Sequence, residues 1–430
     1  MKKLLLITFL ACFSIITSHA QSKKDVVSYN QYFTSARMRV DLILAGNADQ
    51  QKAYLQNIHK EKAWGGTKTF LIDPFEYGSY YYKVFAGEKL IFSHGFCSLF
   101  QEWRTTADAK VNYKAFTNCI WMPYPKEIVK LVIYERIVAT GKFKEMSSFE
   151  IDPTDKLIMK DSSNDFKVDK IVYNGNPTYK MDLVFVAEGY TKKELSKFRA
   201  DCKKFSNYLF ETEPYKTRKK DINIWAVESI SKDSGTDFPH KDIWKNTICN
   251  SNFYTFKVPR YLTAPDHLSV AKLVSNVPFD AIYVLVNEKH YGGGGIYNYY
   301  CMCCSDDKLE AKVFIHEFGH AFAGLGDEYY TSKVAYSDMY PTDVEPWEPN
   351  LTTRVNFESK WKDMITPGTP IPTPNVKTDN SIIGLFEGGG YLSKGVYRPC
   401  WDCRMNSNEA KGYCPVCQRA ITRMLNYYTR

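Results

Sequence analysis

The chain has 430 residues, of which 44% are hydrophobic and 24% charged, and these values are ordinary for a globular protein. The formal net charge of +8 is spread along the chain, and no interleaving of basic and aromatic residues points to a nucleic-acid partner. A chain of this length can bury large cores, so we expect two domains. The aromatic content of 15% fits β-rich structure.

Residues 1–20 have the features of a signal peptide: two lysines, an apolar run over Leu4–Ile16, and a cleavage site after Ala20. A lipoprotein signal at Cys12 is the alternative, but the apolar run continues past that cysteine. No other segment is long and apolar enough to span a bilayer. We therefore expect an exported protein (secreted, periplasmic or on the outer surface) that is soluble or tethered only at its N-terminus.

Residues 21–155 are expected to form an antiparallel β-sandwich, because β-branched and aromatic residues gather there in short runs separated by turns. The predicted strands are residues 67–72, 80–85 and 128–134. The stretch from Arg37 to Glu61 has a more helical pattern. This half has no concentration of His or acidic residues, so we interpret it as structural support. Binding of a substrate or a cell surface is the alternative.

Asp, Ser, Pro and Asn accumulate over residues 152–170, which we interpret as a linker to a second domain over residues 156–430. In this second part, strands are expected to alternate with helices. The expected strands cover residues 181–187, 222–227 and 279–286, and the expected helices cover 192–209 and 268–274. The fold class is therefore α+β, a sandwich followed by an α/β domain.

Four consecutive glycines, Gly292–Gly295, follow the last of these strands. We do not expect a phosphate-binding loop, because no Lys-Ser or Lys-Thr pair follows and no helix starts there. We interpret the run as a flexible edge strand that lets a substrate backbone approach closely.

A His-Glu-x-x-His pattern comes next, in an apolar stretch that is compatible with a helix. His316 and His320 are four positions apart, so on a helix they project from the same face. Two neutral imidazoles there can hold Zn²⁺, and Glu317 beside them is a candidate general base. Gly324 lets the helix end, so a third ligand can come from just downstream. The pattern predicts a zinc hydrolase of the peptidase type.

The chain has eleven cysteines besides Cys12, and export makes disulfides their default state. The odd number leaves at least one thiol free or otherwise engaged. Cys97 and Cys119, both in the β-rich half, are candidates for a local bridge. Two Cys-x-x-Cys pairs near the C-terminus also have the spacing of a structural zinc knuckle. These are Cys400, Cys403, Cys414 and Cys417.

Three stretches together resemble the M64 family, the immunoglobulin A peptidases. They are residues 316–329 (HEFGHAFAGLGDEY), residues 186–191 (VAEGYT), and Cys403-Arg404-Met405 followed by Cys414-Pro415-Val416-Cys417. The β-rich half looks like the N-terminal domain of that family, so the resemblance covers nearly the whole mature chain. It implies a metzincin-like catalytic domain and a Met-turn beneath the zinc, for which Met405 is the matching residue.

The third zinc ligand depends on how the metzincin pattern is aligned. That pattern has a glycine where this chain has Ala323, and Gly324 follows one residue late. Counted from the glycine, Asp327 falls at the ligand position, and we predict it as the third ligand because the turn sets its reach. Glu328 is the alternative. The acid that does not bind the metal is expected to hydrogen-bond a ligand histidine.

The predicted function is that of an exported zinc metalloendopeptidase. Zn²⁺ on His316, His320 and Asp327 would activate a water molecule, and Glu317 would take its proton. Tyr329 or Tyr330 is a candidate for stabilising the oxyanion. The expected partner is a protein or peptide substrate, with immunoglobulin implied by the family name; the oligomeric state stays open. The alternative function is a catalytically silent exported protein that binds a glycan or a protein on a peptidase scaffold.

Overall fold

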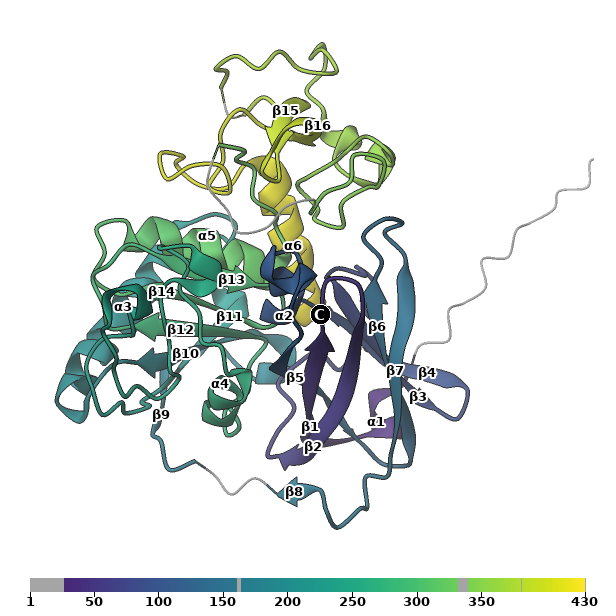
Figure 1. The fold of residues 1–430 in the computed structure, drawn as a ribbon, viewed down its shortest axis with the longest axis vertical. Coiled ribbons are helices and arrows are strands. Elements are labelled where there is room, and N and C mark those ends of the chain that lie inside the picture. Colours follow the sequence, from purple (N-terminus) through teal and green to yellow (C-terminus); the bar gives the residue numbers. More distant parts are fainter. Residues whose placement is uncertain (1–26, 161–163, 332–338, 380, 430) are drawn as a thin grey trace, which may run out of the picture.

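The computed structural model describes residues 27–160, 164–331, 339–379 and 381–429, which form a mixed α/β fold with several sheets and few helices. The predicted signal peptide, residues 1–20, lies outside this described part. Within the described part, no helix has the length and apolar character that crossing a membrane requires. Figure 1 shows a β-rich first half, an α/β second half, and a C-terminal region above them.

The first half contains two four-stranded sheets. One has the order β5-β1-β2-β8, with β1 (Phe33–Gly46), β2 (Gln51–Glu61), β5 (Lys114–Pro125) and β8 (Met159–Lys160). The other has the order β4-β3-β6-β7, with β3 (Tyr80–Ala86), β4 (Lys89–Phe96), β6 (Val129–Arg136) and β7 (Phe143–Ile151). Two short helices, α1 (Tyr29–Tyr32) and α2 (Leu99–Arg104), accompany them.

The two sheets form a sandwich around one apolar core. Leu42 on β1 and Leu131 on β6 are both fully buried in this core, although they belong to different sheets. The strand pairs are antiparallel, except that β8 runs parallel to β2. The predicted strands at 80–85 and 128–134 are confirmed as β3 and β6.

Two of the predictions for this half are wrong. The stretch from Arg37 to Glu61, expected to be helical, forms most of β1 and β2. Charged residues alternate with apolar ones along β1, and both sets are buried, because the second half covers the face that carries the charges. Residues 67–72 form no strand, and only Ile72 makes an isolated bridge, to Ser93.

The second half is built on a six-stranded sheet with the order β13-β14-β12-β10-β11-β9. Its strands are β9 (Val168–Val172), β10 (Met181–Glu188), β11 (Ile222–Val227), β12 (Ala281–Val286), β13 (Gly293–Ile296) and β14 (Tyr300–Cys304). The four central strands are parallel, and the edge strands β9 and β13 are antiparallel to their neighbours. The chain therefore passes from the first half to the second between β8 and β9.

Helices cover both faces of this sheet, as the alternation of side chains along β10 requires. Leu183 and Phe185 face one core with α3 (Leu195–Glu211) and α5 (Glu310–Ala323). Val184 faces the opposite core with α4 (His267–Leu273). The strands and helices predicted between residues 181 and 286 are confirmed by β10, α3, β11, α4 and β12.

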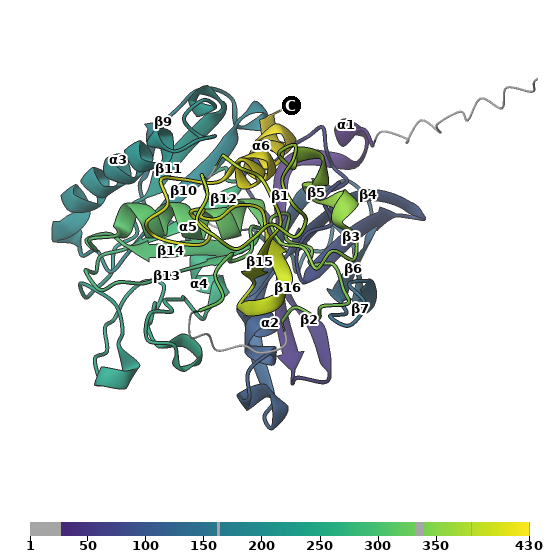
Figure 2. The same ribbon diagram turned by 90° about the horizontal axis from the view of Figure 1, so that it is seen from above.

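The C-terminal region packs against both halves. It contains the hairpin β15 (Phe386–Gly389) and β16 (Leu392–Arg398) and ends in α6 (Pro415–Thr429). Tyr427 on α6 contacts Phe70 and Phe75 of the first half, while α6 also contacts α5 and β10 of the second half. Seen from above, in Figure 2, the β15–β16 hairpin lies over the region between the two halves.

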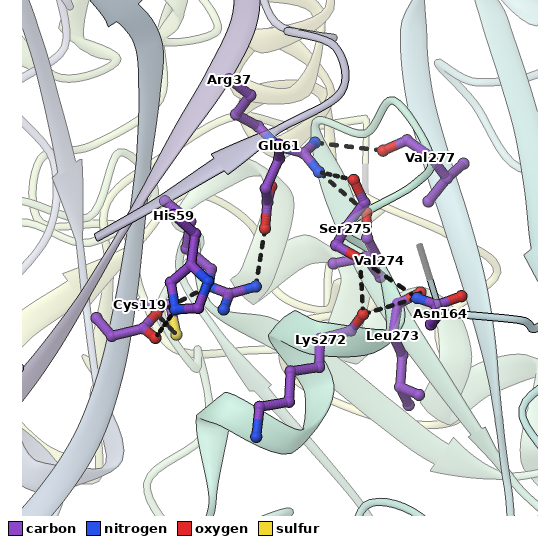
Figure 3. Close-up of polar contacts among 12 residues, drawn as sticks. Arg37, His59, Glu61, Cys119, Asn164, Lys272, Leu273, Val274, Ser275 and Val277 are labelled. Carbon is purple, nitrogen blue, oxygen red and sulfur yellow. Dashed lines mark hydrogen bonds and ion pairs between the residues drawn. The ribbon is translucent and has the colours of Figure 1, made fainter. Parts of the chain in front are cut away.

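A buried polar network joins the two halves (Figure 3). The Arg37 guanidinium of β1 binds the Glu61 carboxylate of β2. It also donates to the backbone oxygens of Val274, Ser275 and Val277, which follow α4, at 3.0–3.2 Å. Arg37 and Glu61 are 1% and 2% exposed, so neither charge can be compensated by water if its partner is removed.

Arg37→Met should destabilise the folded protein by about 3–5 kcal/mol, because it leaves Glu61 short of a partner and removes a side-chain donor from three buried carbonyl groups. Urea unfolding followed by tryptophan fluorescence measures this loss. The matched control is Lys394→Met, which removes an ion pair with Glu387 from a lysine that is 83% exposed, and it should leave the midpoint nearly unchanged. Equal midpoints for the two variants would contradict a role for Arg37 in joining the halves.

Candidate active site

The turn after α5 brings distant residues of one motif together. Gly324 ends the helix in the left-handed conformation, at φ = 62°, as glycine does readily. Its N–H and that of Leu325 donate to the carbonyl oxygens of His320 and Gly319. The chain then turns back along the helix, so the residues that follow can reach the face that carries the two histidines. The predicted helix end at Gly324 is confirmed.

His316 and His320 are held by backbone carbonyl groups. Nδ1 of His316 lies 2.9 Å from the oxygen of Arg404, and Nδ1 of His320 lies 2.5 Å from the oxygen of Leu325. Because a carbonyl oxygen only accepts hydrogen bonds, each Nδ1 must carry the proton. In the neutral imidazoles, the two Nε2 atoms then have free lone pairs. These Nε2 atoms face each other at 3.0 Å.

Asp327 completes this arrangement. Its Oδ1 atom lies 3.1 Å from Nε2 of His316 and 3.3 Å from Nε2 of His320. No donor among the described residues gives Oδ1 a hydrogen bond, whereas Oδ2 accepts one from the hydroxyl of Tyr391. When both imidazoles are neutral, two ring nitrogens and a carboxylate oxygen thus converge as lone-pair donors. That donor set fits a Zn²⁺ ion, which takes nitrogen and oxygen ligands.

Glu328, the alternative third ligand, points elsewhere. Its Oε1 atom accepts a hydrogen bond from Asn350 at 2.9 Å and lies 3.2 Å from the sulfur of Cys417. Asp327 and Glu328, although neighbours in the chain, therefore face different environments. The structure therefore brings Asp327, and not Glu328, to the two histidines. Neither ring nitrogen of these histidines is bonded to Glu328.

The carboxylates of the site favour a positive charge between them, as the pKa shifts of His320 and Asp327 show. Burial alone would lower the pKa of His320, but the carboxylates of Asp327 and Glu317 outweigh it and raise that pKa to about 9. Burial alone would raise the pKa of Asp327, but the two histidines hold it well below its usual range. A divalent cation between these groups would satisfy the same need without protonating the histidines.

Glu317 lies beside the three converging groups. Its carboxylate is within 4.8 Å of the ligand nitrogens of His316 and His320. Burial, the largest influence, raises the pKa of Glu317 above its usual range. The side chain lines a cleft together with both histidines and Asp327. This is the position that the sequence predicts for a general base.

Several residues of the cleft have no sequence signal. They include Glu102, Arg260, Trp347 and Tyr391. Glu102 belongs to α2 of the first half and accepts a hydrogen bond from the hydroxyl of Tyr261 in the second half. The first half, predicted to be structural support, thus also supplies part of the cleft wall. No motif marks these residues, because only the packing of distant segments brings them together.

Of the two tyrosines predicted to help catalysis, only Tyr329 lines the cleft. Its ring stacks near that of His316, with centroids 6.3 Å apart and planes 18° apart. Tyr330 instead packs against Arg398, whose guanidinium carbon is 5.8 Å from the ring centroid. Tyr391, which was not predicted, contacts the Asp327 carboxylate directly.

Gly293–Gly295 lie in the edge strand β13, as predicted, and line the cleft, and they also serve helix packing. A Cβ atom on Gly295 would lie 2.3 Å from the backbone oxygen of Glu317, and one on Gly294 would lie 2.7 Å from the backbone oxygen of Leu262. The space that side chains would need is therefore filled by α5 and by the 261–262 segment. The run lets the motif helix approach the sheet closely.

Gly295→Ala should displace α5 and lower peptidase activity, at a stability cost of about 1–3 kcal/mol, because the added methyl group overlaps a backbone atom of Glu317. Peptide hydrolysis and thermal unfolding measure the two effects. Gly412→Ala is the matched control, since a Cβ atom there meets nothing within 4 Å. Wild-type activity and stability in Gly295→Ala would show that the close approach is not needed.

Met405, the residue matched to a Met-turn, lies fully buried under α5. Gly319 lies between the two histidines on the helix, and a Cβ atom placed on it would be 2.9 Å from the sulfur of Met405. The backbone oxygen of Met405 accepts a hydrogen bond from the N–H of Glu328 at 2.8 Å. The segment that carries Met405 therefore supports both the helix and the residue after Asp327.

The eleven described cysteines are all free thiols. The predicted bridge between Cys97 and Cys119 is wrong, because the two side chains have other partners. Cys97 contacts Ser79 at 3.6 Å, and Cys119 contacts the carboxylate of Asp41 at 3.3 Å. The prediction that the cysteines form disulfides is likewise wrong for the described residues.

Comparison with known proteins gives matches to two family models. A model described as IgA Peptidase M64 matches residues 170–382 and 378–425. A model described as Peptidase M64 N-terminus matches residues 28–146. No curated protein matches the chain. The two models together span both halves of the fold and include every residue of the cleft named above.

Proposed function

Because the chain belongs to the M64 peptidase family, we propose that it is an exported zinc metalloendopeptidase. Membership of the family makes it a peptidase that acts on proteins or peptides. The observation that carries the zinc proposal is the convergence of Nε2 of His316, Nε2 of His320 and Oδ1 of Asp327 within 3.3 Å of one another. Export is proposed from the features of residues 1–20.

His316, His320 and Asp327 are the residues that would hold the catalytic zinc. Bound Zn²⁺ would supply a Lewis acid that lowers the pKa of a water molecule and polarises the scissile carbonyl group. The backbone carbonyl groups of Arg404 and Leu325 fix both imidazoles in the tautomer that presents Nε2. The hydroxyl of Tyr391 orients the Asp327 carboxylate through its other oxygen.

Glu317 is proposed as the general base. Its carboxylate would take a proton from the attacking water and pass it to the nitrogen of the leaving amine. Tyr329, which lines the cleft beside His316, is the candidate for donating to the developing oxyanion. Since Glu317 is in place beside the histidines, no observation favours the alternative of a silent binding protein.

The shape of the cleft supports an endopeptidase. A second hollow shares Arg260, His316 and Glu317 with the first and extends to Asn406–Asn408. The groove therefore continues beyond the histidines, as needed for a chain that passes through the site. No residue of the cleft singles out immunoglobulin, so we propose protein and peptide substrates in general.

A peptide-library digest tests the proposal. The full mature chain is incubated with the library, with and without a zinc chelator, and products are read by mass spectrometry. Internal cleavage should disappear with chelator and return when Zn²⁺ is restored. Cleavage that persists with chelator, or its absence in both arms, would overturn the zinc peptidase proposal.

A further inference from the structure

A second group of potential metal ligands lies in the protein interior behind the cleft. It consists of the sulfur atoms of Cys403, Cys414 and Cys417 and a carboxylate oxygen of Glu328, all within 4.8 Å of one another. The four side chains are between 0% and 3% exposed. None of them belongs to the catalytic arrangement proposed above.

The distances within this group fit a shared ion better than a disulfide. The sulfurs of Cys403 and Cys417 are 3.7 Å apart, and a disulfide would need about 2.05 Å. Two sulfurs bound to one tetrahedral Zn²⁺ at about 2.3 Å each are separated by about 3.8 Å. The Glu328 oxygen lies 3.2 Å from the Cys417 sulfur. The four atoms thus lie close enough to one another to bind a single ion.

The carboxylate of Glu328 is also incompletely satisfied. Oε1 accepts a hydrogen bond from Asn350, but Oε2 has no hydrogen-bond partner among the described residues. A fully buried carboxylate is costly unless a cation or donors compensate it. The three sulfur atoms beside it are of the ligand type that zinc binds most often in structural sites, and zinc also takes carboxylate oxygens.

We propose that Glu328, Cys403, Cys414 and Cys417 bind a structural zinc ion, separate from the catalytic one. Four protein ligands in a dry environment close the coordination shell, which leaves no position for water or substrate. The fourth ligand is a carboxylate rather than the Cys400 thiol that the Cys-x-x-Cys spacing would suggest. Cys400 is buried beside Cys414 but lies outside the four-atom group.

The proposed zinc would fasten together three segments that form the active site. Glu328 directly follows Asp327, Cys403 is two residues from Met405, and Cys414 and Cys417 lie at the start of α6. The N–H of Glu328 already donates to the oxygen of Met405. A metal bond across these segments would hold Asp327 and Met405 at fixed distances from the motif helix.

Metal analysis of the full chain, purified under reducing conditions, tests the site. The wild type should bind a second zinc ion beyond the catalytic one. Cobalt-loaded wild type should show the absorption of thiolate bound to Co²⁺, and Asp327→Ala should keep it. Cys417→Ser should lose this absorption. Its affinity for the second metal should fall further than in substitutions outside the coordination shell, which typically lower metal affinity by about 10- to 100-fold.

Cys400→Ser is the matched control and should retain both the second zinc and the cobalt signal. A single zinc per wild-type chain with no thiolate absorption would overturn the proposal, and so would disulfides among these cysteines in the intact mass of protein purified without reductant. Loss of the signal in Cys400→Ser equal to that in Cys417→Ser would overturn the assignment of Glu328 as the fourth ligand. Because the wild-type measurements need no substitution, a misfolded variant cannot decide the outcome. Peptidase activity is assayed separately, so failure of the catalytic proposal would be seen independently.

Discussion

Replacing Glu317 with glutamine should lower kcat/KM for peptide hydrolysis by about 10²- to 10⁴-fold, the range that a general base contributes. Glutamine keeps the size of the side chain but cannot accept the proton of the attacking water. The zinc content should be unchanged, because the atoms proposed to bind the metal belong to His316, His320 and Asp327. Steady-state hydrolysis of a cleaved library peptide and metal analysis measure the two quantities.

Glu310→Gln provides a matched control for this experiment. Glu310 lies on the first turn of the same helix and pairs with Lys204, away from the cleft. The same chemical change there should leave kcat/KM close to that of the wild type. If Glu317→Gln retains more than about a tenth of the wild-type activity, the assignment of Glu317 as the base is wrong.

Asp327→Ala should remove the catalytic zinc and with it nearly all peptidase activity. Substitutions outside the coordination shell typically cost about 10- to 100-fold in metal affinity, and the loss of a charged ligand should cost more. The two Nε2 atoms that remain, 3.0 Å apart, would hold the metal without a neutralising carboxylate. Isothermal titration of the metal-free protein with Zn²⁺ measures the change in affinity.

Asp363→Ala is the control for loss of a carboxylate, because the Asp363 side chain is 68% exposed and pairs with Arg419 at the surface. It should bind the catalytic zinc as the wild type does. The comparison with Glu328→Ala decides between the neighbouring acids. If Glu328→Ala abolishes activity and catalytic zinc while Asp327→Ala keeps both, the ligand assignment moves by one residue.

The motif itself carried most of what could be predicted about the site. The spacing of His316 and His320 requires only a helix to place both rings on one face, so local structure was enough. Asp327 was harder, because its approach depends on the left-handed turn at Gly324 rather than on helical spacing. The buried strands β10 and β12 were also predictable, since a parallel sheet covered on both faces requires continuous apolar runs.

Other features of the fold and the site could not be predicted, because they depend on contacts between distant segments. The sequence alone does not predict that Arg37 on β1 is buried. In the fold, its guanidinium donates hydrogen bonds to the carbonyl groups that follow α4. Glu102 reaches the cleft from α2, about 200 residues before the motif, and Tyr391 reaches it from the turn between β15 and β16. No local sequence pattern predicts that these residues lie in the cleft. The cysteine spacing predicted either disulfides or a zinc knuckle, while the approach of Glu328 to three of the thiols was not foreseeable.

The contact between Glu102 and Tyr261 has a consequence for how substrate preference is encoded. Because one wall of the groove comes from the first half, its width is set by the docking of two separately recognised sequence modules. Exchanging residues 28–146 for the corresponding module of another family member would change that wall while leaving the catalytic residues untouched. We therefore expect substrate selectivity to depend on both modules, whereas the proposed catalytic residues belong to one of them.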